Sequence, residues 1–595
     1  MSARFVLGID LGTTNCVLAY ASLEADQPHV HLVSVPQLVD RGTTEGRTVL
    51  PAFLYLAGPH DAAGGSLDLP WSSDRSFAVG EFARRQTADA PQWTVGAAKS
   101  WLCHSRVDRR QPILPWNAPD GVPKVSPVAA ARHYLEHLVA AWEHAHPEAP
   151  VGLQRVVLTV PASFDAAARE LTREAALAAG LPQDLILLEE PQAAVYAWLA
   201  VQGDRWRRLL HVGDRLLVCD VGGGTTDLTL IGVTEIDGEL ALQRLAVGDH
   251  LLVGGDNMDL ALAHLVARRF AEQGVKLDPW QTVSLWHSCR NAKEAMLAPG
   301  GPDTYAISIL GRGSKLIGGT VSAELDRTSV VRELTDGFFP RCGFGERPRR
   351  QAVSGFREIG LPYESDTAVT RHVAAFLRSH GGEGSSALPT RVLFNGGVFK
   401  AEVLRQRLLD VVGGWGTDGA RPELLDGEHD LDHAVSLGAA HYGWTKERGG
   451  VRIRGGVARS YYVGIETAGL AVPGAPRPLR ALCVVPFGME EGTERDVPSA
   501  DIGLVLGEPA NFRFFSSAVR KEDQPGHVLE SWSDQELVET DSLETTLPAE
   551  ETTDEPYVPV RFQSRITELG TFELWCVGTQ SVGRWKLEFS VRQED

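Results

Sequence analysis

The sequence predicts an α/β fold of two similar lobes, followed by a β-rich C-terminal segment. Residues 216–231, LLVCDVGGGTTDLTLI, read as an apolar strand, a turn of three glycines and a second apolar strand. Residues 5–19, FVLGIDLGTTNCVLA, repeat this plan near the N-terminus. From about residue 455 onward, short alternating stretches between Gly, Pro and Asp turns predict further strands. The two copies of one hairpin indicate a duplicated fold whose halves face each other across one ligand.

Each hairpin combines a carboxylate, a glycine turn and a pair of threonines. Asp10 and Asp220 end the first strand of their hairpins, and Asp227 adds a carboxylate to the later copy. Glycines let backbone N–H groups approach an anion closely, and carboxylates suit a hydrated divalent cation. The pattern therefore favours a phosphate with its metal ion over the alternative of a simple glycine-rich hairpin. It is not a Walker loop, because no glycine-lysine-serine/threonine sequence precedes a helix.

Composition narrows the class of protein. The formal charge of −20 on 595 residues argues against nonspecific binding to nucleic acid or to acidic membranes. Seven cysteines with no CxxC pair argue against structural zinc or a disulfide framework. The first strand begins almost at the N-terminus, and no apolar run is long enough to span a bilayer. We therefore expect a cytoplasmic protein with neither nucleic acid nor membrane as a partner.

The stretch 156–181, VVLTVPASFDAAARELTREAALAAGL, predicts a strand and then a helix that Ser163 or Asp165 caps and Gly180 ends. The sequence LLEEPQAA follows at residues 187–194. Together with the two hairpins, these residues resemble the heat shock protein 70 family, whose DnaK-type members carry a strand, a helix and an "EP-x-A-A" signature. The chain looks like a divergent, bacterial-like member.

The resemblance implies a two-lobed, actin-like ATPase of duplicated ribonuclease-H-like fold, followed by a β-sandwich-like domain. It divides the chain into a nucleotide-binding domain over residues 1–448, a linker over 449–456 and a substrate-binding-like domain over 457–595. No helical segment follows the last strands, so we expect the family's helical lid to be absent. The implied activity is slow ATP hydrolysis with ATP or ADP and Mg²⁺ as ligands.

The resemblance also assigns roles to single positions. Lys99 stands where the family carries a lysine aimed at the γ-phosphate, with a solvated helix lysine as the alternative. Glu190 matches a glutamate that helps to position water and metal. Pro161 and Arg169 match an interdomain relay, although Arg169 reads equally well as a surface charge. The expected catalytic residues are Asp10, Lys99, Glu190, Asp220, Thr225 and Asp227, and the expected metal site uses Asp10, Asp220 and, through water, Glu190.

Four further stretches resemble the family's nucleotide contacts: GDHLLVGGDNMD at 248–259, LWHSCRNAKEAML at 285–297, RVLFNGGVFKAEVLR at 391–405 and DHAVSLGAA at 432–440. With the hairpins, they give the expected nucleotide-binding residues: Gly12, Thr13, Thr14, Asn15, Gly222, Gly223, Gly224, Thr225, Gly254, Gly255, Arg290, Lys293, Glu294, Gly396, Gly397, Val398, Lys400 and Asp432. Arg290 replaces a ribose-contacting glutamate, and Glu294 and Lys400 replace arginines that pack on adenine. We therefore expect weak base selectivity, unless Phe399 takes over the stacking.

The expected function is that of an ATP-dependent chaperone, in which nucleotide state controls the binding of unfolded polypeptide segments. The expected partners are unfolded or partly folded client proteins, with J-domain and nucleotide-exchange co-chaperones. One alternative is a nucleotide-switched regulatory or assembly ATPase, and a less favoured one is a small-molecule kinase of the same superfamily.

Three segments outside the motifs carry unusual charge patterns. The joining stretch 446–460, KERGGVRIRGGVARS, has only two large apolar residues, Val451 and Ile453, before its last valine, and glycine pairs flank them. It predicts weak coupling between the domains. Residues 341–357 hold five arginines and are interpreted as a solvated loop, or as a docking site for an acidic partner or for this protein's own acidic segment. Residues 533–560 hold many acids and neither Lys nor Arg, which predicts a mobile loop.

Overall fold

The protein is described by a computed structural model. It covers residues 3–587, without 59–64, 74, 105–106, 117, 237, 311–319, 350–360, 362, 381–387, 417–420, 426–429, 458, 468–477, 491, 500–501, 506–508, 535, 541–542, 547–556, 568–571 and 581–582. Much of the arginine-rich insertion and part of the acidic segment therefore lie outside the described residues. Among the described residues, no helix is both long and apolar enough to cross a membrane.

The first sheet carries the N-terminal hairpin at its centre. Its order is β11-β10-β1-β2-β3, and a short strand β6 also pairs with β2. The strands are β1 (Phe5–Leu11), β2 (Asn15–Ser22), β3 (Val30–Leu32), β6 (Leu50–Pro51), β10 (Arg155–Val160) and β11 (Ile186–Glu189). β11, β10 and β1 run parallel, whereas β2 is antiparallel to β1, and β3 to β2.

The second sheet repeats this arrangement around the second hairpin. Its order is β18-β17-β12-β13-β14-β19, with β18, β17 and β12 parallel and with β13 and β14 each antiparallel to its predecessor. The strands are β12 (Arg215–Val221), β13 (Thr226–Ile236), β14 (Glu239–Val247), β17 (Arg391–Asn395), β18 (Glu423–Leu424) and β19 (Ile453–Arg454). Each hairpin thus occupies the same place in a sheet of the same order, as the repeated sequence predicts.

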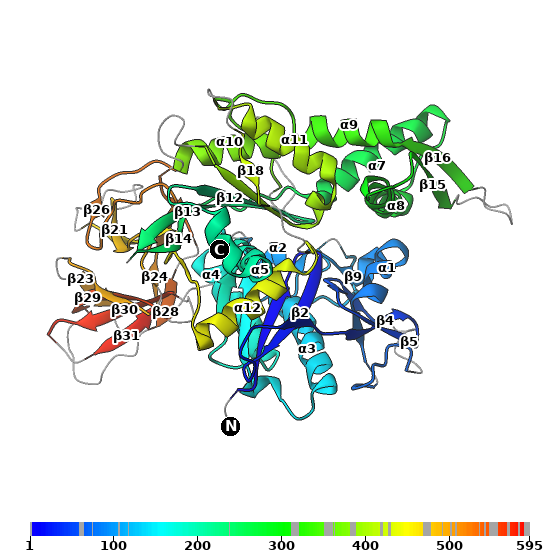
Figure 1. Ribbon diagram of the computed structural model, residues 1–595. Helices are drawn as coiled ribbons and strands as arrows, with labels where there is room; N and C mark the ends of the chain where they lie inside the picture. Colours follow the sequence, from blue (N-terminus) through cyan, green and yellow to red (C-terminus); the bar gives the residue numbers. More distant parts are fainter. Residues whose placement is uncertain are drawn as a thin grey trace.

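Two helices fill the space between these sheets (Figure 1). α5 (Glu190–Gln202) and α12 (Ala434–Arg448) contribute to one apolar cluster with residues of β1, β10, β12, β13, β14 and β17. They cross so closely that a Cβ on Gly438 would lie 1.8 Å from the carbonyl oxygen of Ala193. The pair therefore joins the two lobes as one packed layer.

The remaining helices surround the two sheets, and several of them pack on one another and on the small sheets of each lobe. The first lobe adds α1 (Glu81–Asp89), α2 (Ala98–Leu102), α3 (Pro127–Ala145) and α4 (Ala166–Ala178). The second adds α7 (Gly255–Glu272), α8 (Pro279–Leu297), α9 (Arg327–Phe338), α10 (Val369–His380) and α11 (Glu402–Gly413), and α6 (Trp206–Leu209) precedes β12. Small sheets and hairpins formed by β4 (Val35–Asp40), β5 (Thr43–Arg47), β7 (Leu54–Leu56), β8 (Phe77–Val79), β9 (Thr94–Val95), β15 (Thr304–Leu310) and β16 (Thr320–Asp326) complete the lobes.

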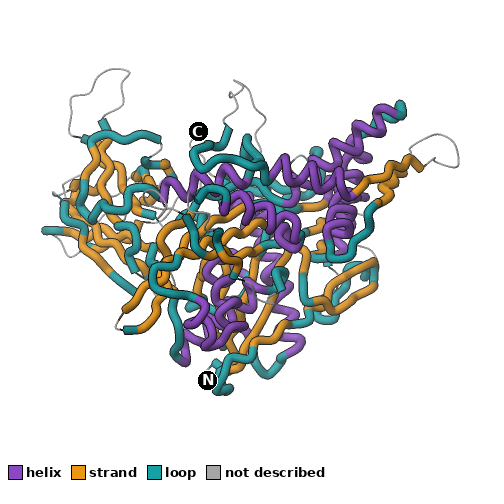
Figure 2. Tube along the Cα trace, turned by 45° about the horizontal axis from the view of Figure 1, so that its top comes forward, coloured by secondary structure: helices purple, strands orange, loops and turns teal. Residues whose placement is uncertain are grey.

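The C-terminal segment is made of antiparallel strands gathered at one end of the molecule (Figures 1 and 2). One sheet has the order β26-β21-β20-β25-β27, the other has β22-β29-β30-β31 with β23 beside β29, and β24 pairs with β28. The strands are β20 (Ser460–Glu466), β21 (Leu479–Val485), β22 (Glu494–Asp496), β23 (Ile502–Val505), β24 (Pro509–Phe512), β25 (Phe514–Ser517), β26 (Val528–Leu529), β27 (Val538–Glu539), β28 (Leu543–Thr546), β29 (Tyr557–Ile566), β30 (Phe572–Gly578) and β31 (Arg584–Leu587). Residues of both five-stranded sheets share one apolar core.

The joining stretch is held against the second sheet. Its strand β19 pairs in parallel with β14, with Ile453 opposite Leu242, and the Ile453 side chain is buried in the cluster between the lobes. Beyond it, Arg459 pairs with Asp249 at 3.3 Å, and Lys521 donates to the carbonyl of Leu245 at 2.9 Å. The alternating Val-Arg-Ile-Arg pattern therefore forms a docked edge strand, although its apolar face is thin.

Candidate functional site

The two glycine turns lie directly against each other. A Cβ added to Gly223 would fall 2.0 Å from Thr14 Oγ1, and one added to Gly224 would fall 3.0 Å from Thr13 Cγ2. Only glycine allows this approach without moving the opposite turn. The hairpins of the two lobes, which are far apart in the sequence, thus meet at one point.

Four carboxylates gather around a single buried lysine at this point. Lys99 on α2 donates to Glu190, the first residue of α5, and its charge also interacts with Asp10 and Asp227. Burial raises the pKa of Glu190, and the nearby charges of Asp10, Asp220 and Asp227 add to this effect, while Lys99 opposes it. The structure thus brings together five of the six residues that the sequence predicts to be catalytic; the sixth, Thr225, closes the glycine turn through its carbonyl, which accepts from Gly222 N–H.

Asp10 and Asp220 in this cluster also accept hydrogen bonds from uncharged side chains. Thr159 on β10 donates to Asp10 at 3.2 Å, and Asn395 at the end of β17 donates to Asp220 at 2.6 Å. Burial raises the pKa of Asp220 to about 7, and the charges of Asp227 and Asp10 contribute, whereas the bond from Asn395 lowers it. Burial likewise raises the pKa of Asp10. The site contains more buried acidic groups than cationic side chains, and a bound positive ion would stabilise the carboxylates in their charged form.

These residues fit a hydrated cation together with a phosphate. Among the described residues, no three His, Cys, Asp or Glu side chains are placed to hold a metal directly. A cation such as Mg²⁺ keeps several waters and takes few carboxylates. Asp10, Asp220 and, through water, Glu190 are the side chains that would hold it, and the facing glycine turns would offer backbone N–H groups to the phosphates.

A cross-lobe contact lies beside the carboxylates. Ser163, in the turn between β10 and α4, donates to Asp227 on β13, and its Oγ lies 2.8 Å from His250 Nδ1. Burial alone would raise the pKa of Asp227, yet the hydrogen bonds from His250 and Ser163 and the charges of His250 and Lys99 hold it below its ordinary value. Of the two candidate caps of α4, Asp165 is the one that accepts from Ala168 N–H, at 2.8 Å. Ser163 is therefore free to bind across the lobes.

The turn that contains Gly254 and Gly255 is hydrogen-bonded to the glycine turn of the second hairpin. Gly255 N–H and Asp256 N–H at the start of α7 donate to the carbonyls of Gly222 and Gly223, at 3.0 and 2.7 Å. Lys293 on α8 donates to the carbonyl of Gly255 at 3.2 Å, and Val398 lies against the same glycine. Gly396 lies beside Asp220 with φ +85°. The predicted stretches around 254, 293 and 396 therefore converge on the glycine turn of β12 and β13.

The departures from the family's adenosine contacts have partners inside the protein. Arg290 donates to Asp259 at 2.8 Å and also pairs with Asp256, while Lys293 Nζ lies 2.7 Å from Asp259. Elsewhere, half-exposed Lys400 pairs with Asp432. Arg290 and Lys400 are thus engaged by carboxylates of this chain.

The suggestion that Phe399 stacks on the base is wrong. Its side chain is fully buried and packs on Phe394, with ring centroids 4.3 Å apart, within the core of the second lobe. Glu294 lies exposed on α8, so neither residue offers a ring or a cation to an adenine.

The predicted relay residue Arg169 belongs to a buried ionic chain. It donates to Glu189 at 3.0 Å, and the other oxygen of Glu189 accepts from Arg244 on β14. Arg244 also donates to the carbonyls of Gly455 and Gly456 in the joining stretch. Arg169 is therefore more than a solvated charge, and Pro161 is buried at the turn that leads to it.

Sequence reasoning missed several members of this site. Thr159, Asn395, His250, Glu189 and Arg244 were given no role, and Ser163 was considered only as a cap. Arg244 carried a signal, because it alternates with Leu242 and Ala246 in the sequence and such a pattern predicts a buried position. Asn395 directly precedes a predicted phosphate-binding glycine, which was a weaker signal.

Comparison with known proteins agrees with this geometry. Residues 72–299 match the family model described as Hsp70 protein. The chaperone protein HscA of Cronobacter sakazakii is 32% identical over 283 residues, and that of Serratia proteamaculans is 32% identical over 286 residues. Each match covers 45% of this chain and 38% of the relative, so the chain spans well under half the length of these relatives. Over this shared region, the chain is similar to the Hsp70 family.

Proposed function

We propose that the protein is an ATP-dependent chaperone in which the two hairpins bind ATP or ADP with Mg²⁺ and the C-terminal strands bind segments of unfolded polypeptide. The single observation that carries the proposal is the gathering of Asp10, Glu190, Asp220 and Asp227 around Lys99 between the facing glycine turns. We assign the paired sheets to a duplicated ribonuclease-H-like, actin-like ATPase over 1–448, and the C-terminal sheets to a β-sandwich over 457–595, joined by 449–456.

In this proposal, the residues of the site divide the work of phosphoryl transfer. Mg²⁺ would neutralise charge on the β- and γ-phosphates. Lys99 is aimed at the transferring group and stabilises the charge that develops on it. Glu190 is paired to Lys99 and orients the attacking water. Asp227 is held ionised by Ser163 and His250 beside the same lysine.

The ionic chain from Arg169 through Glu189 to Arg244 supports a link between hydrolysis and polypeptide binding. Glu189 precedes Glu190, so a shift of α5 on phosphate release changes the position of both. Arg244 passes that change to Gly455 and Gly456 of the linker. J-domain and nucleotide-exchange proteins are the co-chaperones that this type of cycle would use.

The test is ATP turnover by the full chain with Mg²⁺, measured with and without an unfolded polypeptide. The proposal expects slow, Mg²⁺-dependent hydrolysis and nucleotide-dependent binding of the polypeptide. No hydrolysis, with nucleotide binding intact, would favour a nucleotide-switched regulatory module instead. One observation favours that second candidate, namely the pairing of Arg290 and Lys400 with carboxylates of the chain. Transfer of phosphate to a sugar would indicate a small-molecule kinase.

A further inference from the structure

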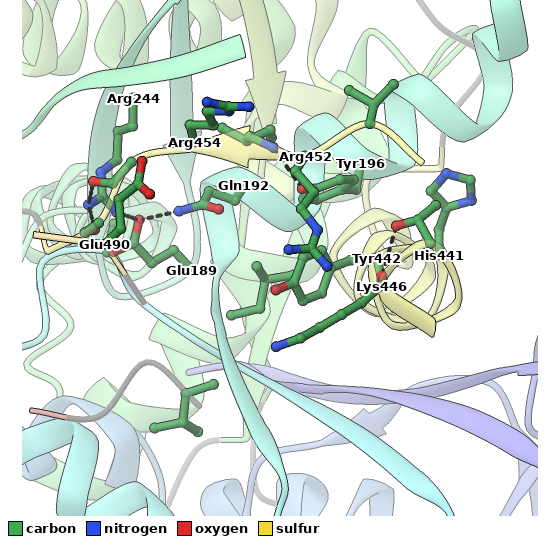
Figure 3. Close-up of a pocket in the computed structure, with 18 of the residues that line it drawn as sticks. Glu189, Gln192, Tyr196, Arg244, His441, Tyr442, Lys446, Arg452, Arg454 and Glu490 are labelled. Carbon is green, nitrogen blue, oxygen red and sulfur yellow. Dashed lines mark hydrogen bonds and ion pairs between the residues drawn. The ribbon is translucent and has the colours of Figure 1, made fainter. Parts of the chain in front are cut away.

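A large cavity opens where the lobes, the linker and the C-terminal strands meet. Its volume is about 1500 Å³, and its walls come from α5, α12, β14, the linker strand β19 and the C-terminal sheets (Figure 3). Tyr196 and Tyr442 from the two central helices line it together with Glu490 and Phe572 from the C-terminal segment. A molecule bound there would touch all three parts of the chain at once.

The cavity is cationic in a protein that is strongly anionic overall. Nine lysine and arginine side chains line it against five carboxylates, whereas the chain carries a formal charge of −20. Most of these cations already have partners: Arg169 and Arg244 share Glu189, Arg459 binds Asp249, and Lys586 binds Glu573.

Two cations differ from the rest. Arg452 and Arg454 of the linker are exposed, and neither forms an ion pair with any residue in the described part of the chain. Figure 3 shows both beside the cavity, next to Tyr196 and Gln192. They are therefore available to a ligand from outside.

Arg452 and Arg454 lie on either side of a buried residue of the linker. Ile453 between them points into the core, and its N–H donates to Tyr196 Oη at 2.9 Å. Arg454 lies in β19 and Arg452 directly precedes that strand, so the two positions are about 7 Å apart along an extended chain at roughly 3.3 Å per residue. Carboxylates at alternate positions of an extended peptide have the same spacing.

The lining of the cavity favours a polypeptide over a uniform polyanion. Aromatic rings of Tyr442 and Phe572 offer contacts to uncharged side chains, while Glu490 would repel an unbroken row of phosphates. We propose that the cavity is a docking site for an extended acidic segment of a partner protein, with carboxylates at alternate positions against Arg452 and Arg454. The bound segment would bridge the lobes, the linker and the C-terminal strands, and so favour the docked linker. This proposal goes beyond the chaperone function and does not depend on ATP turnover.

The test uses the nucleotide-free full chain and fluorescently labelled peptides of about twelve residues, with binding followed by anisotropy. One peptide carries Glu at alternate positions among Ser, Thr and Tyr, a second has the same composition with its Glu residues in one block, and a third has Gln for Glu. We expect the alternating peptide to bind most tightly, the Gln peptide not to bind, and the affinity to fall at least tenfold between low and high salt.

The decisive variant is R452E/R454E, which should weaken binding of the alternating peptide at least tenfold. The matched control is R268E/R332E, which makes the same change in net charge at two exposed arginines of α7 and α9 that form no ion pair in the described part of the chain. It should change binding less than twofold, and both variants should keep the thermal midpoint of the wild type.

Each of the other outcomes overturns the proposal. These are failure of the wild type to bind the alternating peptide, equal binding by R452E/R454E, and equal binding of the block peptide. A single-stranded oligonucleotide that binds as well and displaces the peptide would assign the cavity to nucleic acid. A change of oligomeric state in R452E/R454E would assign it to a second copy of the chain.

Discussion

Arg244 and Glu189 form a buried ion pair in which the same guanidinium also binds the linker, through the carbonyls of Gly455 and Gly456. Glu189 lies at the end of β11, directly before the α5 residue that pairs with Lys99. Glu189 therefore belongs to the contact that clamps the linker, and the next residue, Glu190, belongs to the candidate phosphate site. This polar clamp holds the linker in addition to the thin apolar face of β19.

We predict that Arg244→Met releases the linker. Removal of one partner leaves Glu189 with Arg169 alone, and breaking a buried pair in this way costs about 3–5 kcal/mol. Trypsin should cleave after Arg452 or Arg454 faster than in the wild type, as followed by mass spectrometry. The double variant R244M/E189M should recover only part of the lost stability, because Arg169 then loses the carboxylate of Glu189. It should not protect the linker, because the carbonyl contacts remain absent. Slow linker cleavage in R244M would contradict the clamp.

The hairpins could be predicted from the sequence because the residues that define each hairpin are close together in the chain. Strand, glycine turn and carboxylate follow one another within each copy, and the register Asp220 opposite Asp227 follows from the turn. The same holds for α4, where Asp165 is one of the two predicted caps and accepts from Ala168 N–H.

The parts that the sequence could not predict depend on contacts between distant segments. Asn395 reaches Asp220 only because β17 lies parallel to β12, and Ser163 reaches Asp227 only because the lobes face each other. Likewise, the residues that follow Phe399 suit a surface turn, but the Phe399 ring packs on Phe394 in the core. The sequence pattern does not indicate which distant residues become partners of these side chains.

Lys99→Ala should lower ATP turnover by roughly 100-fold or more while nucleotide binding stays nearly intact, since the lysine is expected to act on the transition state. The measurement is single-turnover hydrolysis beside calorimetric affinity. An exposed control, Lys124→Ala, should leave both values unchanged. Normal turnover in Lys99→Ala would refute the assignment of this residue.

Stability of the metal-free protein should fall as pH rises from about 4 to 7. The pKa of Asp220 is raised to about 7 in the folded state, so over this range the folded chain binds more protons than the unfolded chain. One such group changes the free energy of unfolding by at most about 1.4 kcal/mol per pH unit. Mg²⁺ should therefore raise the thermal midpoint more at pH 8 than at pH 5.5. The variant Asp220→Asn should reduce this difference, and an equal effect of Mg²⁺ at both pH values would contradict the prediction.

Nucleotide selectivity should be poor. Glu294 carries no cation and Lys400 is paired with Asp432, so the cation–π and stacking contributions of about 1 kcal/mol each are missing from the base. Calorimetry should give weak affinities for ATP and GTP that differ only a few-fold. Tight binding with strong preference for adenine would show that another part of the chain contacts the base.

Coupling between nucleotide and polypeptide should be weak and should depend on Arg244. β19 contributes two paired residues and one buried isoleucine, so it offers little apolar area for a nucleotide-dependent change to act on. We expect ATP to change the affinity for an unfolded peptide only a few-fold, about 1 kcal/mol of coupling. In Arg244→Met even this difference should vanish, while the affinity measured with ADP stays near the wild-type value. Peptide binding in the presence of ATP and of ADP, measured for the wild type, R244M and the exposed control R268M, gives the coupling for each. A tenfold or larger effect of ATP in the wild type would mean that the Arg169–Glu189–Arg244 chain transmits far more than the apolar face of the linker can. If such an effect persisted in R244M, the transmission would lie at another contact, such as Arg459 with Asp249.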